Sequence, residues 1–475
     1  MTTVATLTPP TLTPQGGRRR RGIELIMLGF AIVLTLAAYS AVQMGVLGRY
    51  PTDLPVVAAY LVACAGVAHL AVRRLAPYAD PVILPVAFAL NGLGLVLIHR
   101  LDLAARAGLG SLLPSGDAGR QMIWTALSIL LFVAVLGVVR DHRLLQRYTY
   151  TAMVLGLVLL LLPMLPVIGT QVNGARIWIH LGPLSFQPGE IAKVVLMVFF
   201  AGYLVAKREV LTLASRRVLG VDLPRARDLG PILVAWAASV LILVGQSDLG
   251  TSLLFFGGFV AVLYVATERL SWILIGMVLF VAGSWFAVIT FAHVAERFQI
   301  WLHPFRYAEN QSYQLVQGLY GFAAGGILGR GLGRGMPELV PYAKTDFIVA
   351  TIGEELGLTG LMAVLVLYLV LAERGLRSAL GVRDTFGKLL AAGLTFSLAL
   401  QVFVVVGGVT RLIPLTGLTT PFLSYGGSSL VTNYVLIALL LRISDAARRP
   451  APTATPATPA TVAITGDAPT QAVRT

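Results

Sequence analysis

The stretch QPGEIAKVVLMVFF, residues 187–200, decides the fold class because a helix-start signal leads directly into an apolar run. Pro188 suits the first turn of a helix, where its missing N–H costs nothing. Glu190 then falls in that first turn, where the helix dipole favours an anion, and Lys193 lies one turn deeper on the same face. Since burying one charge in hydrocarbon costs roughly 3 kcal/mol, two charges at the mouth of a membrane-length helix indicate a specific role.

The whole chain has the composition of an integral membrane protein. Of its 475 residues, 57% are hydrophobic and only 12% are charged, whereas a soluble protein carries about 25% charged residues. The single cysteine, Cys64, excludes a disulfide framework within one chain. The net charge of +14 is distributed over short loops, as membrane topology requires, and no basic domain is left to bind nucleic acid.

Apolar runs of about 20 residues, the length that a bilayer requires, recur along the chain. They predict an all-α, polytopic transmembrane bundle of about 12 helices, within a range of 10–12. The GQSD stretch at 246–249 leaves open whether two helices or one kinked helix form there. The expected spans are 23–44, 54–75, 82–99, 121–138, 150–168, 188–206, 230–246, 249–267, 271–292, 346–372, 386–410 and 420–443.

The distribution of lysine and arginine predicts the orientation. If the N-terminus is cytoplasmic, the inside segments hold 24 Lys and Arg residues and the outside segments hold 11, so both termini are expected in the cytoplasm. Residues 1–22 and 447–475 are predicted to be disordered cytoplasmic tails around a membrane domain at 23–446. The long segment 293–345 then lies outside the cell, and its residues 312–328 are apolar enough for a short re-entrant or interfacial helix.

Two stretches on this outer side carry cations. In NGARIWIHLGPLSFQPGEIAK, residues 173–193, Arg176 and Lys193 predict a cationic pocket for an anionic headgroup; a capped helix with a snorkelling lysine is the alternative. In GRGLGRG, residues 329–335, free backbone N–H groups and the guanidinium groups of Arg330 and Arg334 could hold a phosphate or pyrophosphate. The alternative for this second stretch is a flexible solvated turn.

Two further stretches carry acids or broken helix. In KTDFIVATIGEELG, residues 344–357, Asp346 is expected at the membrane edge and Glu354 about 12 Å deeper on a continuous helix; a polar contact between helices is the alternative. In GGVTRLIPLTGLTTPFLSYGGSSL, residues 407–430, prolines and glycines break regular helix, which is tolerated at membrane depth only where protein or water satisfies the backbone. Close packing of small residues is the alternative there. Asp248 is expected first as a helix N-cap.

The spacing of the six histidines predicts no metal cluster, and no nucleophile motif such as GxSxG is present. We therefore expect no metal site built from histidine. No cofactor is certain from the sequence, and a divalent cation, Mg²⁺ or Mn²⁺, is left open.

Five motifs occur together: NGARIWI with FQPGEIAK, SDLGT, YQLVQ before the glycine-rich turn, TDFIVATIGEELG, and PLTGLTTPFLSYGGSS. In this order they resemble the SEDS family of membrane proteins (FtsW, RodA and SpoVE) over residues 23–446, most closely its actinobacterial RodA-type members. The resemblance implies a peptidoglycan glycosyltransferase that polymerises lipid II, an undecaprenyl-pyrophosphate-linked disaccharide peptide, at the outer face of the cell membrane. It would serve elongation, cell shape or division, with a class B penicillin-binding protein, a transpeptidase, as its partner.

The resemblance also implies residue roles, with one departure. The position of the family's presumed catalytic aspartate, three residues after Pro304 and six before Tyr313, is occupied by Tyr307. A phenol is a far weaker acid than a carboxyl group, so Glu309 is expected to serve as the base. The expected catalytic residues are Glu309, Asp346 and Glu354. The expected substrate-binding residues are Arg176, Glu190, Lys193, Asp248, Arg297, Gln314, Arg330, Lys344 and Ser424.

Two other functions remain open from the sequence. Tyr307 favours a non-catalytic scaffold that only binds a partner's transmembrane helix. Charged residues within the bundle are compatible with a flippase for the same lipid, although no inverted repeat is evident.

Overall fold

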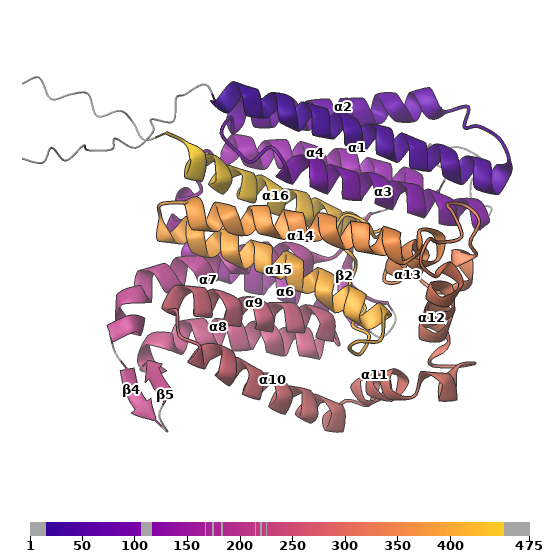
Figure 1. Cartoon of the computed structure of the whole chain (residues 1–475). Helices are drawn as coiled ribbons and strands as arrows, with labels where there is room; N and C mark the ends of the chain where they lie inside the picture. Colours follow the sequence, from indigo (N-terminus) through magenta and orange to yellow (C-terminus); the bar gives the residue numbers. More distant parts are fainter. Residues whose placement is uncertain are drawn as a thin grey trace, which may run out of the picture.

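The computed structural model describes residues 16–105, 116–166, 168–172, 175–181, 184–213, 215–218, 221–224 and 226–450. It is a bundle of helices that run roughly parallel or antiparallel to one another (Figure 1). The expected all-α membrane architecture is therefore confirmed.

In the described part of the chain, ten helices are long and apolar enough to cross a membrane, and two shorter apolar helices accompany them. This agrees with the expected range. The ten long helices are α1 (Gly16–Leu47), α2 (Leu54–Leu75), α3 (Ile83–Ala104), α4 (Asp117–Val138), α7 (Pro188–Leu213), α9 (Leu249–Thr267), α10 (Ser271–Thr290), α14 (Gly357–Gly381), α15 (Thr385–Val409) and α16 (Gly427–Arg448). The shorter apolar stretches belong to α6 (Thr149–Leu161) with the 3₁₀ turn η1 (Leu162–Met164), and to α8 (Ala226–Gly245).

Short elements connect these helices. The helical ones are α5 (Leu144–Arg147), α11 (Ala292–Leu302), η2 (Pro304–Tyr307), α12 (Tyr313–Gly325), η3 (Pro337–Leu339) and α13 (Ile348–Glu355). The helix expected within 312–328 thus forms as α12. The strands are β1 (Gly169–Val172), β2 (Ala175–Leu181), β3 (Leu184–Phe186), β4 (Ser215–Val218) and β5 (Val221–Pro224).

The strands form two small antiparallel sheets outside the bundle. In the first, of order β1-β2-β3, Thr170 pairs with Trp178 and Ile179 pairs with Phe186, with an irregularity in β1. The second consists of β4 and β5. The first sheet leads into Pro188, so it fixes the start of α7.

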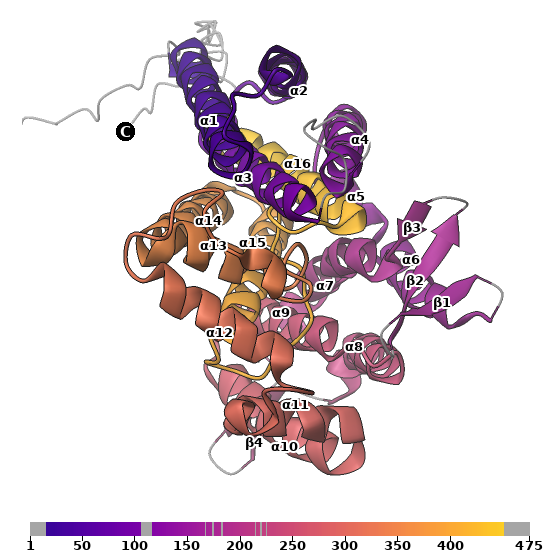
Figure 2. The ribbon, with the colours of Figure 1, turned by 90° about the vertical axis from the view of Figure 1, so that its right-hand side faces the viewer.

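The centre of the bundle is formed by α3, α7, α15 and α16, whose apolar residues are mostly buried, whereas α10 lies at the periphery with little buried surface. Figure 2 shows α7, α15 and α16 enclosed by the other helices. The first residues of α1 and the last of α16 lie at one end of the bundle, here the terminal end, and α11, α12 and α13 lie at the other, here the site end (Figure 1).

Two helix boundaries answer questions that the sequence raised. The GQSD stretch separates two helices: Ser247 has φ 62°, and the Asp248 carboxylate accepts a 3.0 Å hydrogen bond from the Thr251 N–H as an N-cap. The continuous span expected at 346–372 is wrong, because α13 ends at Glu355 and α14 starts at Gly357, which has φ 68°. A Cβ on Gly357 would overlap the Gly329 nitrogen, so the packed glycine-rich loop accompanies this break.

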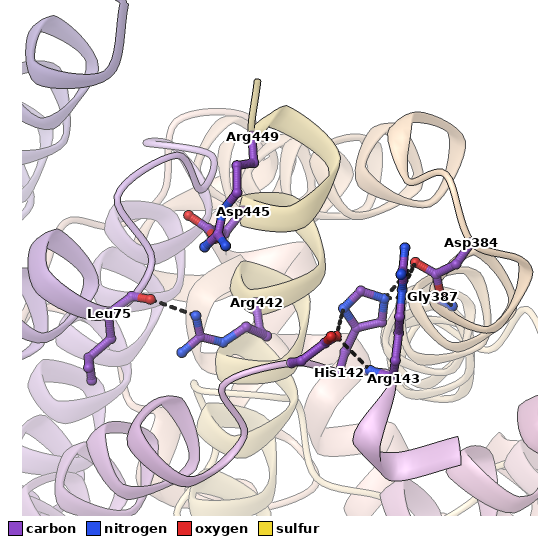
Figure 3. A network of polar contacts seen from close by, with 9 residues as sticks. Leu75, His142, Arg143, Asp384, Gly387, Arg442, Asp445 and Arg449 are labelled. Atoms are coloured by element: carbon purple, nitrogen blue, oxygen red, sulfur yellow. Dashed lines mark hydrogen bonds and ion pairs between the residues drawn. The ribbon is translucent and has the colours of Figure 1, made fainter. Parts of the chain in front are cut away.

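Charged side chains fasten the terminal end (Figure 3). The Asp384 carboxylate contacts His142 Nε2 at 2.9 Å and accepts a 2.7 Å hydrogen bond from the Gly387 N–H at the start of α15. On α16, Arg442 donates to the Leu75 carbonyl at 2.5 Å, and Asp445 accepts from the Tyr78 N–H at 2.8 Å. These contacts join segments that are far apart in the sequence, so they hold the bundle closed at this end.

Candidate functional site

Charged and polar side chains from five segments meet at the site end, which faces the viewer in Figure 2. The segments are the first turn of α7, the first turn of α9, helix α11, residues 344–346, and the irregular stretch 410–426 between α15 and α16. Because α7 and α9 both begin here, the positive ends of their dipoles face this region.

The ion pair expected from the 187–200 stretch is present and buried. Lys193 Nζ lies 3.0 Å from Glu190 Oε2, and it also donates a 2.8 Å hydrogen bond to Gln401 Oε1 of α15. The Gln401 amide in turn donates to the Thr419 carbonyl at 2.9 Å. The pair therefore connects α7 through α15 to the irregular stretch, and Lys193 is a part of the bundle interior rather than a snorkelling lysine.

Arg297 of α11 lies near two further acids, Asp248 and Asp346, and its charge acts on both. Its guanidinium donates to the carbonyls of Leu415 and Thr416, at 3.2 Å each. Arg297 Nη2 and Asp346 Oδ2 each lie 3.9 Å from the position that a Cβ on Gly417 would take. The two groups therefore converge on the 415–417 turn, where Gly417 has φ 73°.

The acids beside Arg297 have perturbed proton affinities. Burial raises the pKa of Asp346, which precedes α13, to about 6, although the Arg297 charge and a hydrogen bond with Thr345 oppose this shift. Burial also raises the pKa of Asp248, although its hydrogen bonds with Thr251 lower it. Titratable groups with shifted pKa values are typical of functional sites. We refer to Glu190, Lys193, Asp248, Arg297 and Asp346 as the charged cluster.

Ser424 fixes the backbone that carries Asp346. Its hydroxyl donates to the Thr345 carbonyl at 2.5 Å and accepts from the Thr420 N–H at 2.8 Å. Next to it, the Tyr425 N–H donates to the Lys344 carbonyl at 2.7 Å. The Lys344 side chain pairs with Asp117 at the start of α4. The 344–346 segment is therefore held on two sides, which positions the Asp346 carboxylate.

A cavity of about 530 Å³ lies at the end of α11, and its lining includes none of the charged-cluster residues. Arg411 closes one side of it by donating to the carbonyls of Trp301 and Leu302, at 2.9 and 3.0 Å. The residues that line the cavity are Trp301, Leu302, Phe305, Leu319, Thr410 and Arg411. Its lining is mostly apolar, so it suits a hydrophobic group more than a phosphate.

The chain matches the model of a known protein family. Residues 81–449 match the family model for FtsW, RodA and SpoVE, described as cell cycle proteins. The chain belongs to the FtsW/RodA/SpoVE family. The resemblance that the five motifs indicated is thus confirmed.

Curated relatives and solved structures support membership in the FtsW/RodA/SpoVE family. The chain is 51% identical over 448 residues to the peptidoglycan glycosyltransferase RodA of Mycobacterium leprae, which covers 94% of both chains. It is 52% identical over 445 residues to the RodA of Mycobacterium tuberculosis strain H37Rv, covering 94% of this chain and 93% of the relative. A solved structure, described as structural coordination of polymerization and crosslinking by a peptidoglycan synthase complex, matches 77% of this chain and 97% of that chain, with 27% identity and a TM-score of 0.62.

The acids expected from family resemblance lie in different surroundings. Glu309 is exposed in the turn after η2, and the structure records no side-chain hydrogen bond or ion pair between it and any other described residue. Tyr307, at the family's aspartate position, is half-buried beside Arg306, whose guanidinium lies 5.9 Å from the ring centre. The assignment of Glu309 as the base stays a prediction.

Glu354 is buried beneath the glycine-rich loop of residues 329–335. One carboxylate oxygen accepts a 2.7 Å hydrogen bond from the Met336 N–H, and the Glu354 carbonyl accepts from the Arg330 N–H at 3.0 Å. This geometry supports the loop, and the expected catalytic role of Glu354 stays a prediction.

The hypothesis that free N–H groups of the glycine-rich loop bind phosphate is wrong for most of the loop. The Gly331 N–H donates to the Glu355 carbonyl at 2.9 Å, and the Gly333 N–H donates to a Glu355 carboxylate oxygen at 3.1 Å. The Arg334 N–H donates to the Gly331 carbonyl at 3.1 Å. The side chains of Arg330 and Arg334 are exposed, so they remain available to a ligand.

Two remaining candidates lie at the margin of the site. Arg176 is exposed on β2, where its N–H donates to the Gln246 carbonyl at 3.3 Å. In Figure 2 the β1–β3 sheet lies at the opposite edge of the site end from α12. Gln314 donates to the Pro341 carbonyl at 3.2 Å and so joins α12 to the segment before α13.

Several residues that complete the site carry no local signal in the sequence. Gln401 lies in an apolar helix, and its partner Lys193 is 208 positions away in the chain. Arg100 of α3 donates to Glu355 Oε1 at 2.8 Å and to the Gly335 carbonyl at 2.7 Å, across similar separations. Among the described residues, no group of three or more His, Cys, Asp or Glu side chains is arranged to hold a metal ion. The possible divalent cation stays a prediction.

Proposed function

We propose that this chain is a peptidoglycan glycosyltransferase that polymerises lipid II into glycan strands at the outer face of the cell membrane, during elongation, shape maintenance or division. Membership of the FtsW/RodA/SpoVE family and 51% identity to a peptidoglycan glycosyltransferase over 94% of the chain support the activity. The charged cluster at the site end is the single structural observation that carries it. Cations stabilise the charge of a lipid-linked pyrophosphate, and the cluster contains two, the buried Lys193 and the half-buried Arg297.

In the proposed reaction, the hydroxyl oxygen of the acceptor sugar attacks the anomeric carbon of the donor sugar. The bond from that carbon to the pyrophosphate oxygen breaks, and the hydroxyl proton passes to a carboxylate. Lys193 and Arg297 stabilise the negative charge that develops on the departing pyrophosphate. Glu190 keeps the Lys193 ammonium oriented, and Gln401 fixes it from α15.

Asp346 is the base in this proposal. Its carboxylate lies beside Arg297, its backbone is fixed through Ser424, and its pKa of about 6 is close to that of an effective base at neutral pH. The exposed Glu309 is the alternative base. For Glu309 to act as the base, the 304–312 turn would have to move toward the charged cluster. Arg176, Gln314, Arg330 and Lys344 are proposed to contact the substrate around the cluster.

The proposal includes orientation and partner. The excess of lysine and arginine in the segments at the terminal end supports an orientation with both termini in the cytoplasm and the site end outside. The neighbouring solved structure is a peptidoglycan synthase complex that couples polymerization with crosslinking. This likeness supports a class B penicillin-binding protein as the partner.

The test is polymerisation of labelled lipid II by purified full-length protein with its penicillin-binding partner. We expect glycan strands with the wild type, loss of polymer with Asp346→Asn, and near-normal polymer with Glu309→Gln. Polymer that persists in Asp346→Asn and disappears in Glu309→Gln would transfer the role of base to Glu309. No polymer from any preparation, with intact partner binding, would contradict the enzyme assignment.

Tyr307 favours a second function, a non-catalytic scaffold for the transpeptidase. In that case the wild type binds its partner, and the transpeptidase needs another polymerase. Restoring an acid by Tyr307→Asp distinguishes the two functions: a gain of polymerisation from a silent wild type supports the scaffold.

A further inference from the structure

The glycine-rich loop of residues 329–335 is a supported platform that presents two guanidinium groups. Glu354 and Glu355 accept three of its backbone N–H groups from below, those of Arg330, Gly331 and Gly333. The side chains of Arg330 and Arg334 are exposed, and the structure records no hydrogen bond or ion pair between either guanidinium and another described residue. The position of the loop backbone therefore determines where these two positive charges lie.

The last turns of α1 pack closely against the other side of this loop. A Cβ on Gly45 would lie 2.5 Å from the Leu332 carbonyl oxygen, and a Cβ on Gly333 would lie 2.9 Å from the Val42 carbonyl oxygen. Gly333 also has φ 78°, a conformation that favours glycine. Two glycines are thus needed for the helix and loop backbones to approach so closely.

Helix α3 holds both partners of this contact. His99 Nε2 lies 3.0 Å from Gln43 Nε2 of α1. The next residue, Arg100, hydrogen-bonds to Glu355 and to the Gly335 carbonyl. Consecutive residues of one helix thus bind α1 on one side and the base of the glycine-rich loop on the other, so the contact between Gly45 and Leu332 is built into the fold.

Helix α1 ends before residue 81, where the match to the family model begins. We propose that the last turns of α1 are a positioning element for the active site: Gly45 supports the glycine-rich loop and thereby holds Arg330 and Arg334 where they bind an anionic group of the lipid-linked substrate. This inference rests on the proposed function. It assigns to a helix outside the family model an effect on substrate binding that acts through the loop.

The test compares two valine substitutions in the same helix. Gly45→Val displaces the loop, whereas Gly29→Val is a matched control, because a Cβ on Gly29 meets no atom within 4 Å. We expect Gly45→Val to raise the KM for lipid II about tenfold with little change in kcat, because charge-assisted contacts to the substrate are lost while the reacting groups stay in place. Gly29→Val should leave both KM and kcat at the wild-type values. A folding defect alone would instead reduce the fraction of active protein, which lowers the apparent kcat and leaves KM unchanged.

A second measurement does not depend on activity. Trypsin cleaves after arginine, so cleavage after Arg330 and Arg334, identified by mass spectrometry, reports how firmly the loop is held. We expect faster cleavage in Gly45→Val than in Gly29→Val or the wild type. Leu332→Ala, which loosens the loop without changing α1, should reproduce both effects and serves if Gly45→Val does not fold.

The outcomes separate the two proposals. Equal trypsin rates and equal KM values in Gly45→Val and Gly29→Val would overturn the positioning role while leaving the proposed function intact. If no variant polymerises lipid II, the proposed function is wrong, and the trypsin rates still decide whether α1 holds the loop. Faster cleavage in both Gly45→Val and Leu332→Ala supports that it does.

Discussion

Replacing Lys193 with methionine tests whether the buried ion pair serves the reaction or only the fold. The substitution removes an ammonium group that lies 3.0 Å from Glu190 Oε2 and 2.8 Å from Gln401 Oε1. Removing one partner of a buried ion pair costs about 3–5 kcal/mol, because the other charge stays buried without compensation. The amide oxygen of Gln401 also loses its donor, which adds roughly 1 kcal/mol. We therefore expect a marked fall in the unfolding temperature of Lys193→Met.

The double variant Glu190→Gln/Lys193→Met separates stability from activity. It leaves no unpaired charge, so the cost should fall to about 1–2 kcal/mol, since neutral replacement of a buried pair is often tolerated. Thermal unfolding and lipid II polymerisation are measured on the same purified preparations. We expect the double variant to recover most of the stability and none of the activity, because no cation faces the pyrophosphate from α7. Polymerisation by the double variant at the wild-type rate would refute a role for Lys193 beyond packing.

Four further predictions concern acids and the groups that hold them. Since the pKa of Asp346 is about 6, polymerisation should rise with pH through this value, and a flat profile from pH 5 to 8 would contradict Asp346 as the base. The raised pKa of Asp346 means that ionisation of this carboxyl group opposes folding, and the full cost is present above pH about 6. Asp346→Asn should therefore be inactive, yet at alkaline pH it should unfold at a higher temperature than the wild type. A lower unfolding temperature would count against the burial argument. Ser424→Ala leaves a buried carbonyl and N–H without partners, so it should destabilise the protein by about 1–3 kcal/mol and reduce kcat, whereas unchanged kcat would show that the Asp346 backbone is fixed elsewhere. Burial alone would raise the pKa of Asp384, but hydrogen bonds from His142 and Gly387 outweigh burial and hold that pKa below its usual range. Asp384→Asn should therefore lower the unfolding temperature at neutral pH. The difference in unfolding temperature from the wild type should shrink as the pH falls toward the folded-state pKa, and melting curves of both proteins over a pH series check this.

Local chemistry made much of this fold predictable from the sequence. Pro188 and Asp248 start helices through contacts within one turn, and the Glu190–Lys193 pair needs only the spacing of a helix. Membrane spans depend on length and hydrophobicity, which the sequence displays directly. The membrane class and the ion pair at the start of α7 followed from these features.

The parts that were missed depend on contacts between distant segments. A lone glycine within an apolar run is tolerated in a helix, so nothing near Gly357 indicates that the backbone of residue 329 packs against it. Likewise, the glycine-rich loop suggested free N–H groups, and only the fold shows that Glu355 accepts them. Gln401 became part of the site because α15 packs against α7, which no local pattern encodes.

The ion pairs at the end of α16 define where this protein can be engineered. Asp445 accepts from the Tyr78 N–H and pairs with Arg449, while Arg448 pairs with Asp80. A reporter or purification tag joined after residue 450 leaves these bonds untouched. A C-terminal truncation that removes Asp445 and the residues after it leaves the Tyr78 N–H without its acceptor and Asp80 without Arg448. Shortened versions for crystallisation should therefore retain Arg449.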